Sequence, residues 1–436
     1  MKSANIGFRD HLRYERGQLA FDGISCELLA EKYGTPLYVI SENRIRQNLR
    51  SFREALTGLY ERILVCPAYK ANSHLAVARI YQNEGAGAEV VSGIELKMAL
   101  DSRVQPERIV FNGPYKSAED LEVAISSEIG LINADSMTEI KHLQDVAMRL
   151  GRKCNVGIRV NLGISPETHP HLATASREHK FGIWIGDSMR AYREASACSA
   201  LNVVGVHCHV GSNISESRIF RQMASRIIRL VVSIREKIGL NLTKIDLGGG
   251  LGFPYQPGSP TISKDQYSSA VLAGNLKVLK RLGDPMLIFE PGRILIADAG
   301  VLLTRVAAQK RQGKTEWGIV DAGMSTFLRP ALYGAKHQVI AVRSDSIKVQ
   351  YNLGGPCCES ADVIAKNVRL PKLSKGDLLA VLDVGAYGFT MASNYNGQAR
   401  PSVVLVSEGR GHLIRRREEY EDLVAEESVP AHLRKN

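Results

Sequence analysis

Long apolar runs are missing from this 436-residue sequence. No stretch approaches the roughly 20 consecutive apolar residues that a membrane-spanning helix needs, which argues against an integral membrane protein. The first residues, MKSANIGFRDHLRYERG, also lack the apolar core of a secretory signal peptide. These two absences predict a cytoplasmic protein that has no membrane partner.

Cysteine is scarce, and its spacing matches no zinc-binding pattern. The seven cysteines are odd in number, so most of them are expected to be small core residues in a reducing compartment. The vicinal pair Cys357 and Cys358 is the exception. His169, His171 and His179 fall in one loop without the spacing of a single helical face. No metal site is therefore predicted.

A concentrated basic surface is also missing. The formal net charge is +11, but the excess is spread along the chain, with one local cluster, RRREEY, near its end. A nucleic-acid-binding protein would be expected to carry a basic stripe or a known module, so no nucleic-acid partner is predicted. The excess charge could attract an anionic substrate, and an ordinary solvated surface explains it equally well.

What the sequence does contain is a regular alternation of strand-like and helix-like segments. Such alternation is typical of a parallel sheet with crossover helices. Eight units match a (β/α)₈ barrel, which typically has about 250 residues; an open doubly wound sheet is the alternative, but the regularity favours closure. Strands are predicted at 62–69, 87–91, 108–113, 130–135, 155–162, 202–210, 244–250 and 286–293. Helices are predicted at 73–84, 93–101, 117–127, 137–151, 186–199, 216–239 and 264–281.

The pattern changes after about residue 300. Short strand-like runs are separated there by Gly, Asp and Pro turns, and few helical patterns intervene. The strand-like pieces QLAFDG and TPLYVIS near the N-terminus are candidates to pair with this region. We therefore predict an α/β + β fold: a barrel over residues 37–298, and a mostly antiparallel β-domain from residues 1–36 and 299–436.

Chemically versatile residues stand at the predicted carboxyl ends of four strands, where barrel enzymes place their active sites. Lys70 follows the first strand, and His207 and His209 end the sixth. Three glycines, 248–250, end the seventh strand, and EPGR at 290–293 ends the eighth. Each has an ordinary explanation: a solvated lysine, a hydrogen-bonded histidine, a turn or a surface ion pair. Their placement at one rim favours a ligand site.

These residue types fit one cofactor. Gly248 to Gly250 offer backbone N–H groups that can cradle a phosphate, and Ser212 can add a hydroxyl donor. Glu290 is a carboxylate that could face a ring nitrogen, and His209 is a flat ring that could stack. Lys70 has an amine that could capture an aldehyde. A phosphate, a ring nitrogen and an aldehyde together describe pyridoxal 5'-phosphate.

The sequence resembles a known family, the fold-type III pyridoxal-phosphate decarboxylases. Six motifs occur in the family's order: YKAN, HCHVGS, LGGGLG, EPGR, GPCCESAD and GAYGFTMASNYN. Within that family, THP, KFG and DAGMSTFLRPALY resemble the branch that converts meso-2,6-diaminopimelate to L-lysine and CO₂, the last step of lysine biosynthesis. The resemblance covers residues 27–432 approximately and implies an alanine-racemase-like barrel with a β-domain.

The resemblance also implies roles for individual residues. Lys70 would hold the cofactor covalently, His209 would stack on its ring, and Glu290 would keep the ring nitrogen protonated, since an opposite charge favours the charged form. Cys358 would return a proton after decarboxylation, which suits a thiol because its pKa, about 8.5, lies near neutrality. Further cofactor contacts would come from Ser212, Gly248, Gly249, Gly250, Pro291, Gly292, Arg293 and Tyr387. The substrate would contact Arg293, Arg329, Tyr333, Glu359 and Tyr387.

The implied substrate contacts favour a distal group that carries both charges. Arg293 and Arg329 would repel the distal ammonium of ornithine or lysine, whereas guanidinium groups bind carboxylates bidentately. Glu359 would suit an ammonium beside that carboxylate, as in diaminopimelate. Active sites in this family form between two subunits. A homodimer is therefore implied, in which Cys358 and Glu359 reach into the partner's site.

Several positions depart from the pattern of the branch. Glu89 stands where Asp is usual, Ile94 replaces a small residue, Leu162 replaces a proline, and Ala173–Ala175 replaces STG in the substrate-side loop. An alternative therefore stays open: the same decarboxylation of a related amino acid or carboxylated diamine, such as a siderophore, antibiotic or polyamine precursor.

Three other classes are weaker matches. A non-catalytic homologue would be expected to lack Lys70 or Cys358, and both are present. An amino-acid racemase of the same fold would need a second base and would lack the CES motif. A barrel enzyme without this cofactor would have no reason to carry all six motifs in order.

Overall fold

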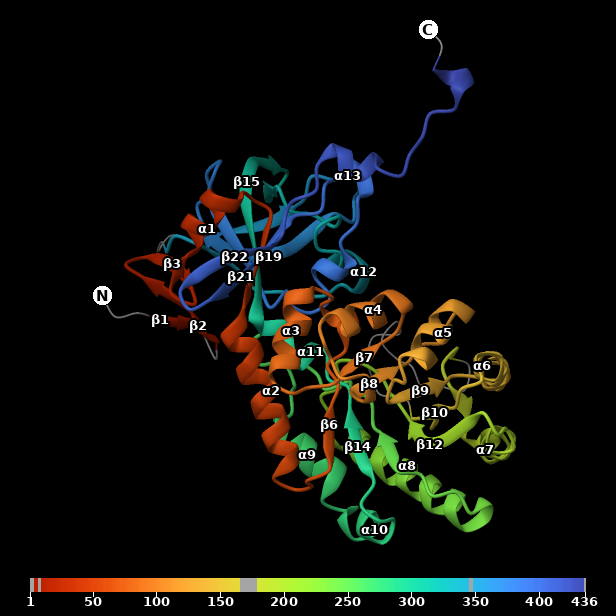
Figure 1. Ribbon diagram of the computed structural model, residues 1–436. Helices are drawn as coiled ribbons and strands as arrows, with labels where there is room; N and C mark the ends of the chain where they lie inside the picture. The colour runs from red at the N-terminus through yellow and green to blue at the C-terminus, as the bar shows by residue number, and fades with distance from the viewer. Residues whose placement is uncertain (1–3, 7–8, 165–178, 345–347, 435–436) are drawn as a thin grey trace. The chain divides into compact units, whose positions relative to one another are not determined.

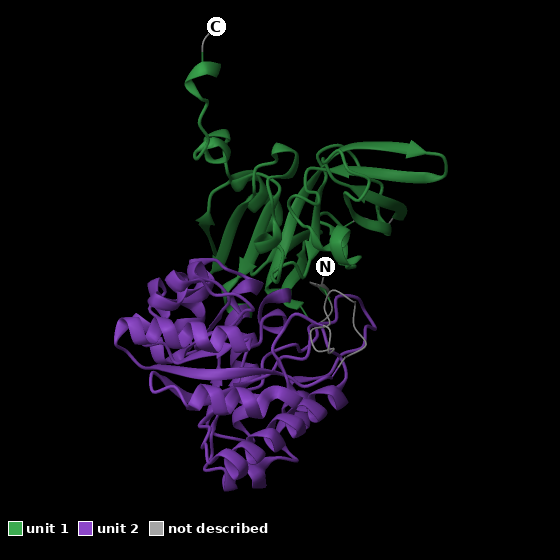
Figure 2. Ribbon diagram, turned by 90° about the vertical axis from the view of Figure 1, so that its right-hand side faces the viewer, with its two compact units in different colours: residues 1–44, 298–436 green, residues 45–297 purple. Residues whose placement is uncertain are grey.

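The computed structural model describes residues 4–6, 9–164, 179–344 and 348–434 (Figure 1). The chain forms two compact units, one from residues 45–297 and one from residues 1–44 together with 298–436 (Figure 2). In the described ranges, none of the helices combines the length and the apolar character that crossing a membrane requires.

The first unit contains eight parallel strands that close into a barrel. Their order is β6-β14-β13-β12-β10-β9-β8-β7. The two ends of this row are joined by backbone hydrogen bonds, from Gly87 to the Val65 carbonyl at 2.9 Å and from Glu89 to the Pro67 carbonyl at 3.1 Å. The predicted (β/α)₈ barrel is therefore confirmed. Its strands are β6 (Ile63–Val65), β7 (Ala88–Val90), β8 (Ile109–Phe111), β9 (Leu131–Ala134), β10 (Cys154–Asn161), β12 (Leu201–His207), β13 (Lys244–Asp246) and β14 (Met286–Phe289), and the short β11 (Ile183–Trp184) pairs with β10.

Helices follow the strands, and serines set where several of them begin. Ser92, Ser117, Ser136 and Ser263 each accept a hydrogen bond from a backbone N–H in the first turn of a helix, which satisfies a donor that the helix itself leaves unpaired. The helices are α2 (Glu42–Thr57), α3 (Leu75–Asn83), α4 (Gly93–Asp101), α5 (Ala118–Ser126), α6 (Met137–Leu150), α7 (Ser188–Ser196), α8 (Ser217–Ile238), α9 (Lys264–Leu272), α10 (Leu276–Arg281) and α11 (Arg293–Ile296).

Two features of these helices differ from the prediction. The helix predicted at 264–281 is divided into α9 and α10. The break falls at Gly274 and Asn275, where the Asn275 side chain donates to the Val271 carbonyl at 2.8 Å and so competes with the helical backbone bond. The second difference is that α2 and the short α11 were not predicted from the sequence.

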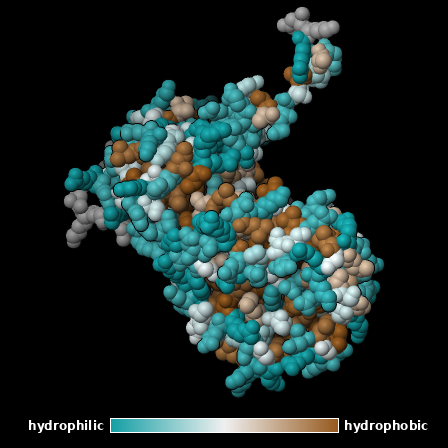
Figure 3. All heavy atoms as spheres, in the orientation of Figure 1, coloured by the Kyte–Doolittle hydropathy of each residue, from teal (hydrophilic) through white to brown (hydrophobic). Residues whose placement is uncertain are grey.

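Apolar residues fill the barrel and the helix faces that cover it. Leu64, Val110, Leu131 and Ile288 form a buried cluster contributed by four different strands. The surface seen in Figure 3 is mostly hydrophilic, with apolar residues dispersed among polar ones. This distribution is ordinary for a globular protein, whose surface always retains apolar atoms.

The second unit is built around a mixed sheet with the order β19-β18-β16-β15-β5-β21-β22. Most neighbouring strands are antiparallel, and the β16/β18 and β5/β21 pairs are parallel, so the expected mostly antiparallel character is confirmed. The strands are β5 (Leu37–Ser41), β15 (Gly300–Gln312), β16 (Thr315–Val320), β17 (Val339–Ala341), β18 (Lys348–Gly354), β19 (Val363–Pro371), β20 (Leu378–Leu382), β21 (Ser402–Ser407) and β22 (Arg410–Arg415). A smaller sheet contains β1 (Ala4–Ile6), β2 (Arg9–Glu15), β3 (Gln18–Phe21) and β4 (Ile24–Ser25), and the helices are α1 (Cys26–Tyr33), α12 (Arg329–Tyr333) and α13 (Tyr420–Val424).

Candidate active site

Lys70 lies just beyond the carboxyl end of β6, in the short 3₁₀ turn η1 (Tyr69–Ala71). Its Nζ donates to Oε2 of Glu89 at 2.5 Å, and the side chain of Lys70 is 40% exposed whereas that of Glu89 is 1% exposed. The lysine at this strand end is thus held by a buried carboxylate from the neighbouring strand β7. An amine in this position is fixed in place and still reachable from solvent.

Asn112, which follows β8, connects this pair to Glu290, which follows β14. Its Nδ2 donates both to Oε1 of Glu89 at 3.1 Å and to Oε1 of Glu290 at 2.5 Å. Asn133 donates in turn to Oδ1 of Asn112 at 2.8 Å. The network therefore runs from Lys70 to Glu290, two residues that the sequence placed at separate strand ends.

Two buried side chains without a predicted role flank Glu290: His207, which was named only as a strand-end residue, and Asp246. His207 Nε2 lies 3.4 Å from Oε2 of Glu290. Asp246 accepts from the Gly248 N–H at 3.0 Å and from Asn133 Nδ2 at 3.3 Å. Both residues end barrel strands, and that position was the signal that could have identified them.

The acid groups of this cluster shift one another's proton affinity. Burial raises the pKa of Asp246, and the neighbouring Glu290 raises it further. Burial would also raise the pKa of Glu290, but the charge of His207 and hydrogen bonds with His207 and Asp246 hold it well below its ordinary value. These opposite directions favour the anionic form at Glu290 rather than at Asp246.

The glycines at 248–250 leave no room for side chains. Gly248 and Gly250 have φ values of +62° and +105°, which favour glycine. A Cβ at Gly249 would lie 2.2 Å from the carbonyl oxygen of Glu290, and one at Gly250 would lie 2.4 Å from that of Gly211. This close approach fits a backbone cradle for an anion.

Arg293 is buried beside this glycine loop, with 4% of its surface exposed. Its Nη2 donates to Oγ of Ser212 at 3.0 Å, and its Nη1 donates to the Tyr255 hydroxyl at 2.7 Å. The predicted cofactor contacts Ser212 and Arg293 are thus brought together, and Tyr255 is a third member that the sequence analysis did not find.

His209 stands at the same rim, where its Nδ1 accepts from the Gly249 N–H at 3.2 Å. Burial, with added repulsion from Arg159 and Lys70, lowers the pKa of His209 to about 3. The ring is therefore neutral near pH 7. A neutral, flat ring is suited to stacking on an aromatic cofactor.

The remaining predicted residues belong to the second unit. Cys358 is exposed, and its N–H donates to Oδ1 of Asn396 at 2.7 Å. Cys357 is buried, with its Sγ 3.6 Å from Oγ of Ser325. Asp362 accepts from the Cys357 N–H at 2.7 Å. The loop therefore presents one thiol to solvent and buries the other.

Three further residues of this unit are held in defined positions. Arg329 is 4% exposed, and its Nε donates to Nε2 of His337 at 3.4 Å. Its guanidinium lies 5.9 Å from the centre of the Tyr333 ring. Tyr387 has a φ of +55°, a strained conformation for an aromatic residue that is typical of functional sites. Glu359 is exposed.

The departures noted in the sequence have different surroundings. Glu89 is the buried partner of Lys70. Ile94 is 74% exposed, whereas Leu162 is 2% exposed and its carbonyl accepts from Arg226 at 2.9 Å. Ala173–Ala175 lies outside the described residues, as do His169 and His171.

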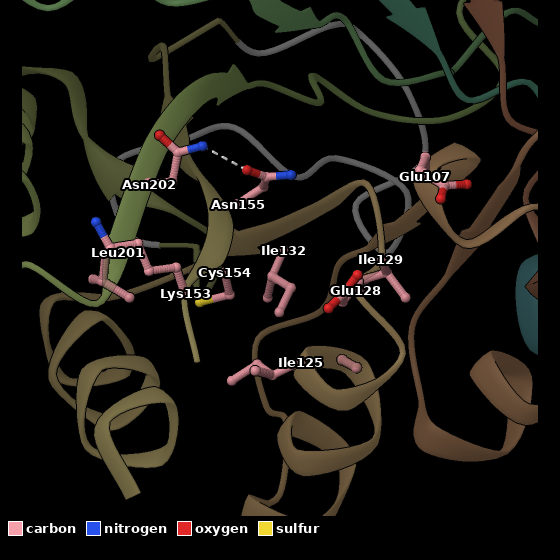
Figure 4. A pocket seen from close by; sticks show the side chains of 11 residues that line it. Glu107, Ile125, Glu128, Ile129, Ile132, Lys153, Cys154, Asn155, Leu201 and Asn202 are labelled. Atoms are coloured by element: carbon pink, nitrogen blue, oxygen red, sulfur yellow. Dashed lines mark hydrogen bonds between the residues drawn. The ribbon is translucent and has the colours of Figure 1, made fainter. Parts of the chain in front are cut away.

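A hollow of about 400 Å³ lies at the other end of the barrel strands (Figure 4). Lys153 and Cys154 at the start of β10, and Leu201 and Asn202 at the start of β12, line it. Because barrel enzymes carry their chemistry at the carboxyl ends of the strands, the cluster around Lys70 is the candidate active site and this hollow is not.

Comparisons with known proteins agree with this assignment. Residues 42–297 match the model of the family described as pyridoxal-dependent decarboxylase, pyridoxal binding domain. The chain is 40% identical to a diaminopimelate decarboxylase of Methanocaldococcus jannaschii over 99% of this chain and 100% of that protein. It is 38% identical to one of Aquifex aeolicus over 96% and 97%.

Solved structures extend the similarity to the fold. A crystal structure of the M. jannaschii diaminopimelate decarboxylase in co-complex with L-lysine has a TM-score of 0.93, with 39% identity over 98% of this chain and 99% of that one. A Helicobacter pylori diaminopimelate decarboxylase complexed with L-lysine has a TM-score of 0.87, with 35% identity over 92% and 98%. The chain therefore belongs to the diaminopimelate decarboxylase family of pyridoxal-dependent decarboxylases.

Proposed function

We propose that this protein decarboxylates meso-2,6-diaminopimelate to L-lysine and CO₂, with pyridoxal 5'-phosphate bound at Lys70. The observation that carries the proposal is the hydrogen-bonded row from Lys70 through Glu89 and Asn112 to Glu290. It places an amine and a carboxylate on the same rim of a barrel whose relatives are diaminopimelate decarboxylases.

The residues present fit this cofactor. The glycine loop has no space for a Cβ where a phosphate would approach the backbone. When bound, the cofactor supplies a ring that accepts the electron pair left by the departing CO₂. Glu290 holds a proton on the ring nitrogen, and Lys70 fixes the cofactor covalently.

The other barrel residues orient the cofactor. His209 stacks on the ring as a neutral imidazole. Ser212 and the N–H groups of Gly248, Gly249 and Gly250 bind the phosphate, together with the turn at Pro291, Gly292 and Arg293 and the Tyr387 hydroxyl. Because Arg293 already donates to Ser212, it also steadies that hydroxyl.

The substrate contacts distinguish diaminopimelate from simpler diamines. Arg329 and Arg293 bind the distal carboxylate, because guanidinium presents paired donors to a carboxylate. Glu359 binds the distal ammonium, and Tyr333 and Tyr387 complete the contacts. Cys358, whose thiol is exposed, returns a proton to the carbon that lost CO₂. We further propose a homodimer in which Cys358 and Glu359 act in the site of the partner subunit.

Reductive trapping tests the covalent link. Borohydride treatment of the holoenzyme followed by peptide mapping is expected to place the cofactor on Lys70, and Lys70→Ala is expected to lose the cofactor's absorbance. Lys97→Ala, a change at an exposed lysine of α4, is the matched control and should keep both signals. A label on a different lysine would overturn the assignment.

A panel of amino acids tests the substrate. CO₂ release and product mass are expected to identify diaminopimelate as the substrate and lysine as the product, with ornithine, lysine and arginine much weaker. Glu359→Ala should weaken the use of diaminopimelate. Preferred turnover of another amino acid would favour the alternative decarboxylase function.

A further inference from the structure

Three acid–base groups lie together in the interior of the barrel. His207, Asp246 and Glu290 are 1%, 0% and 6% exposed, and one side-chain nitrogen or oxygen atom from each lies within 4.8 Å of the others. Two carboxylates this close in a dry site cannot both ionise without a large cost, so such a pair holds a proton. The question is which carboxyl group carries it.

The neighbours of the two carboxyl groups answer this question. Glu290 faces His207 on one oxygen and accepts from Asn112 on the other. Asp246 accepts from the neutral N–H groups of Gly248 and Asn133, the second at 3.3 Å. Glu290 also ends the hydrogen-bonded row that begins at the Lys70 ammonium, whereas these donors to Asp246 are neutral. The directions of the two pKa shifts, raised for Asp246 and lowered for Glu290, agree with this placement.

We propose that Asp246 carries the shared proton in the working enzyme and is a positioning residue that keeps Glu290 anionic. The part that concerns the cofactor's ring nitrogen rests on the proposed function. As a neutral acid, Asp246 can donate to Glu290 without adding a second negative charge. Glu290 is thereby made a weak base, and the proton that it shares with the ring nitrogen stays on that nitrogen.

Other titratable groups surround the pair and enter any pH dependence. They are Cys66 just after β6, Lys70 in the η1 turn, Glu89 in β7, Arg159 in β10, His207 in β12, Cys208 and His209 just after β12, and Tyr267 in α9. Burial raises the pKa of the thiols of Cys66 and Cys208, so neither adds a negative charge near neutral pH.

Infrared spectroscopy tests the proton directly, without relying on turnover. At about pH 8 the wild-type protein is expected to show the carbonyl stretch of a protonated carboxylic acid, which Asp246→Asn removes. Burial raises the pKa of Glu95 to about 7 and that of Asp383 to about 6, so both are largely ionised under these conditions. Glu95→Gln is the matched control and should leave the band in place.

Isotope labelling keeps the test valid if Asp246→Asn does not fold. Because burial also raises the pKa of Asp22, the labelled protein carries Asp22→Asn. Grown with aspartate labelled by carbon-13 at the side-chain carboxyl, it should show the same band shifted to lower frequency. An unshifted band would place the proton on a glutamate and overturn the proposal. Absence of any such band at about pH 8 would also overturn it.

A matched pair of variants tests the consequence for the ring nitrogen. The holoenzyme is reconstituted with cofactor labelled by nitrogen-15 in its ring, and nitrogen NMR reports whether that nitrogen is protonated. Asp246→Asn retains a neutral donor and should keep the protonated signal, whereas Asp246→Leu should shift it toward the unprotonated one. The same large shift in both variants would mean that Asp246 acts as a charge, which contradicts the proposal.

The two proposals fail in different ways. If Lys70 does not hold the cofactor, borohydride mapping fails while the infrared band of Asp246 is unaffected. A divalent cation bound by the cluster is the competing explanation for three such groups at close range. Metal analysis of the purified holoenzyme is expected to find less than one ion per site, and a stoichiometric ion that is lost in Asp246→Asn would overturn the proposal.

Discussion

At the scale of single residues, Lys116 is a fully enclosed charge of the barrel unit. Its side chain has no exposed surface, and its Nζ donates to the Gly113 carbonyl, the Asn133 carbonyl and Oε1 of Glu139, each at 3.0 Å. All three ammonium protons thus have partners. Because Glu139 is also buried, the pair can be broken only by leaving a charge behind in a site of low dielectric.

We expect Lys116→Met to destabilise the protein by about 3–5 kcal/mol, the usual cost when one partner of a buried ion pair is removed. Chemical denaturation followed by circular dichroism measures this loss. Lys153→Met, at an exposed lysine, is the control. The double variant Lys116→Met with Glu139→Gln should recover part of the loss, and full additivity of the two changes would contradict the ion-pair explanation.

The sequence identified the residues of the site that stand alone at strand ends. Lys70 and Glu290 were visible because each follows an apolar run and has an unusual chemical type for that place. Asn112, Asn133 and Asp246 were not identified, because their roles depend on contacts across the barrel. Asn112, for example, meets Glu290 over a sequence separation of 178 residues, and no local pattern encodes such a contact.

At the scale of elements, the loop after β13 shows how backbone packing shapes the site. The place of a Cβ at Gly249 is occupied by the carbonyl oxygen of Glu290, at 2.2 Å. Any larger residue must therefore push apart the two loops that follow β13 and β14. The predicted phosphate contacts lie on these same loops.

We expect Gly249→Ala to weaken pyridoxal-phosphate binding about tenfold or more, equivalent to about 1.4 kcal/mol, because it displaces the turn that begins at Glu290. Titration of apoenzyme with cofactor, followed by absorbance, measures the affinity. Gly274→Ala is the matched control, since a Cβ there meets nothing within 4 Å. Equal affinities for the two variants would show that this close approach does not shape the cofactor site.

The packing of α2 against the end of α3 depends on one carboxylate. Glu84 accepts from Arg46 at 2.6 Å and from Arg50 at 2.7 Å. The hydrogen bond from Arg50 is the largest influence, and together with Arg46 it holds the pKa of Glu84 below its ordinary value of 4.5. A carboxyl group whose pKa is lowered by folding stabilises the folded state at pH values above its ordinary pKa. This contribution is lost as the pH falls through the pKa of the folded state.

Glu84→Gln is therefore expected to lower stability by about 1–3 kcal/mol at neutral pH, the range for hydrogen bonds to charged groups. The difference from wild type should narrow below about pH 4.5, where the wild-type carboxylate also becomes protonated. Thermal unfolding across this pH range tests both statements. Glu61→Gln, at an exposed glutamate, should show neither effect, and a difference that stays constant with pH would contradict the argument.

Secondary-structure elements were predictable where a single hydrophobic period dominates the local sequence. All eight barrel strands were predicted because short β-branched runs alternate with helical segments. The helix α2 was missed, although Ile45, Leu49, Phe52 and Leu56 are buried on one face of it, because its many charged residues conceal that spacing. The boundary between α9 and α10 depends on a side-chain bond of Asn275 that periodicity does not report.

At the scale of the whole molecule, the chain contributes to the β-unit at both ends. β5 pairs in parallel with β21 and antiparallel with β15, so residues 37–41 meet residues 300–303 and 402–406. Such pairing is set by which hydrophobic faces can be buried together. The sequence predicted that TPLYVIS is strand-like and a candidate to pair with the C-terminal region, which these pairings confirm, but its partners and their register leave no mark in the local sequence.

The barrel unit exposes large apolar side chains near its carboxyl-terminal rim. Leu75 at the start of α3, Ile94 at the start of α4 and Tyr115 after β8 are 53%, 74% and 76% exposed. Exposed apolar patches mark surfaces that another protein covers, and these three residues are candidates for such a surface. Their place at the same end of the barrel as Lys70 is consistent with the proposed homodimer.

Mixed dimers test whether two chains share each active site. Lys70→Ala and Cys358→Ala should each be nearly inactive alone. If Lys70 of one subunit works with Cys358 of its partner, random reassociation in equal amounts gives heterodimers with one intact site. Activity should then recover to about a quarter of wild type, as expected for a two-fold symmetric dimer.

The control is to mix each single variant with the double variant Lys70→Ala/Cys358→Ala, since neither mixture creates an intact site. If both residues act within one chain, the mixture of single variants stays inactive while sedimentation still shows dimers, and the shared site is ruled out.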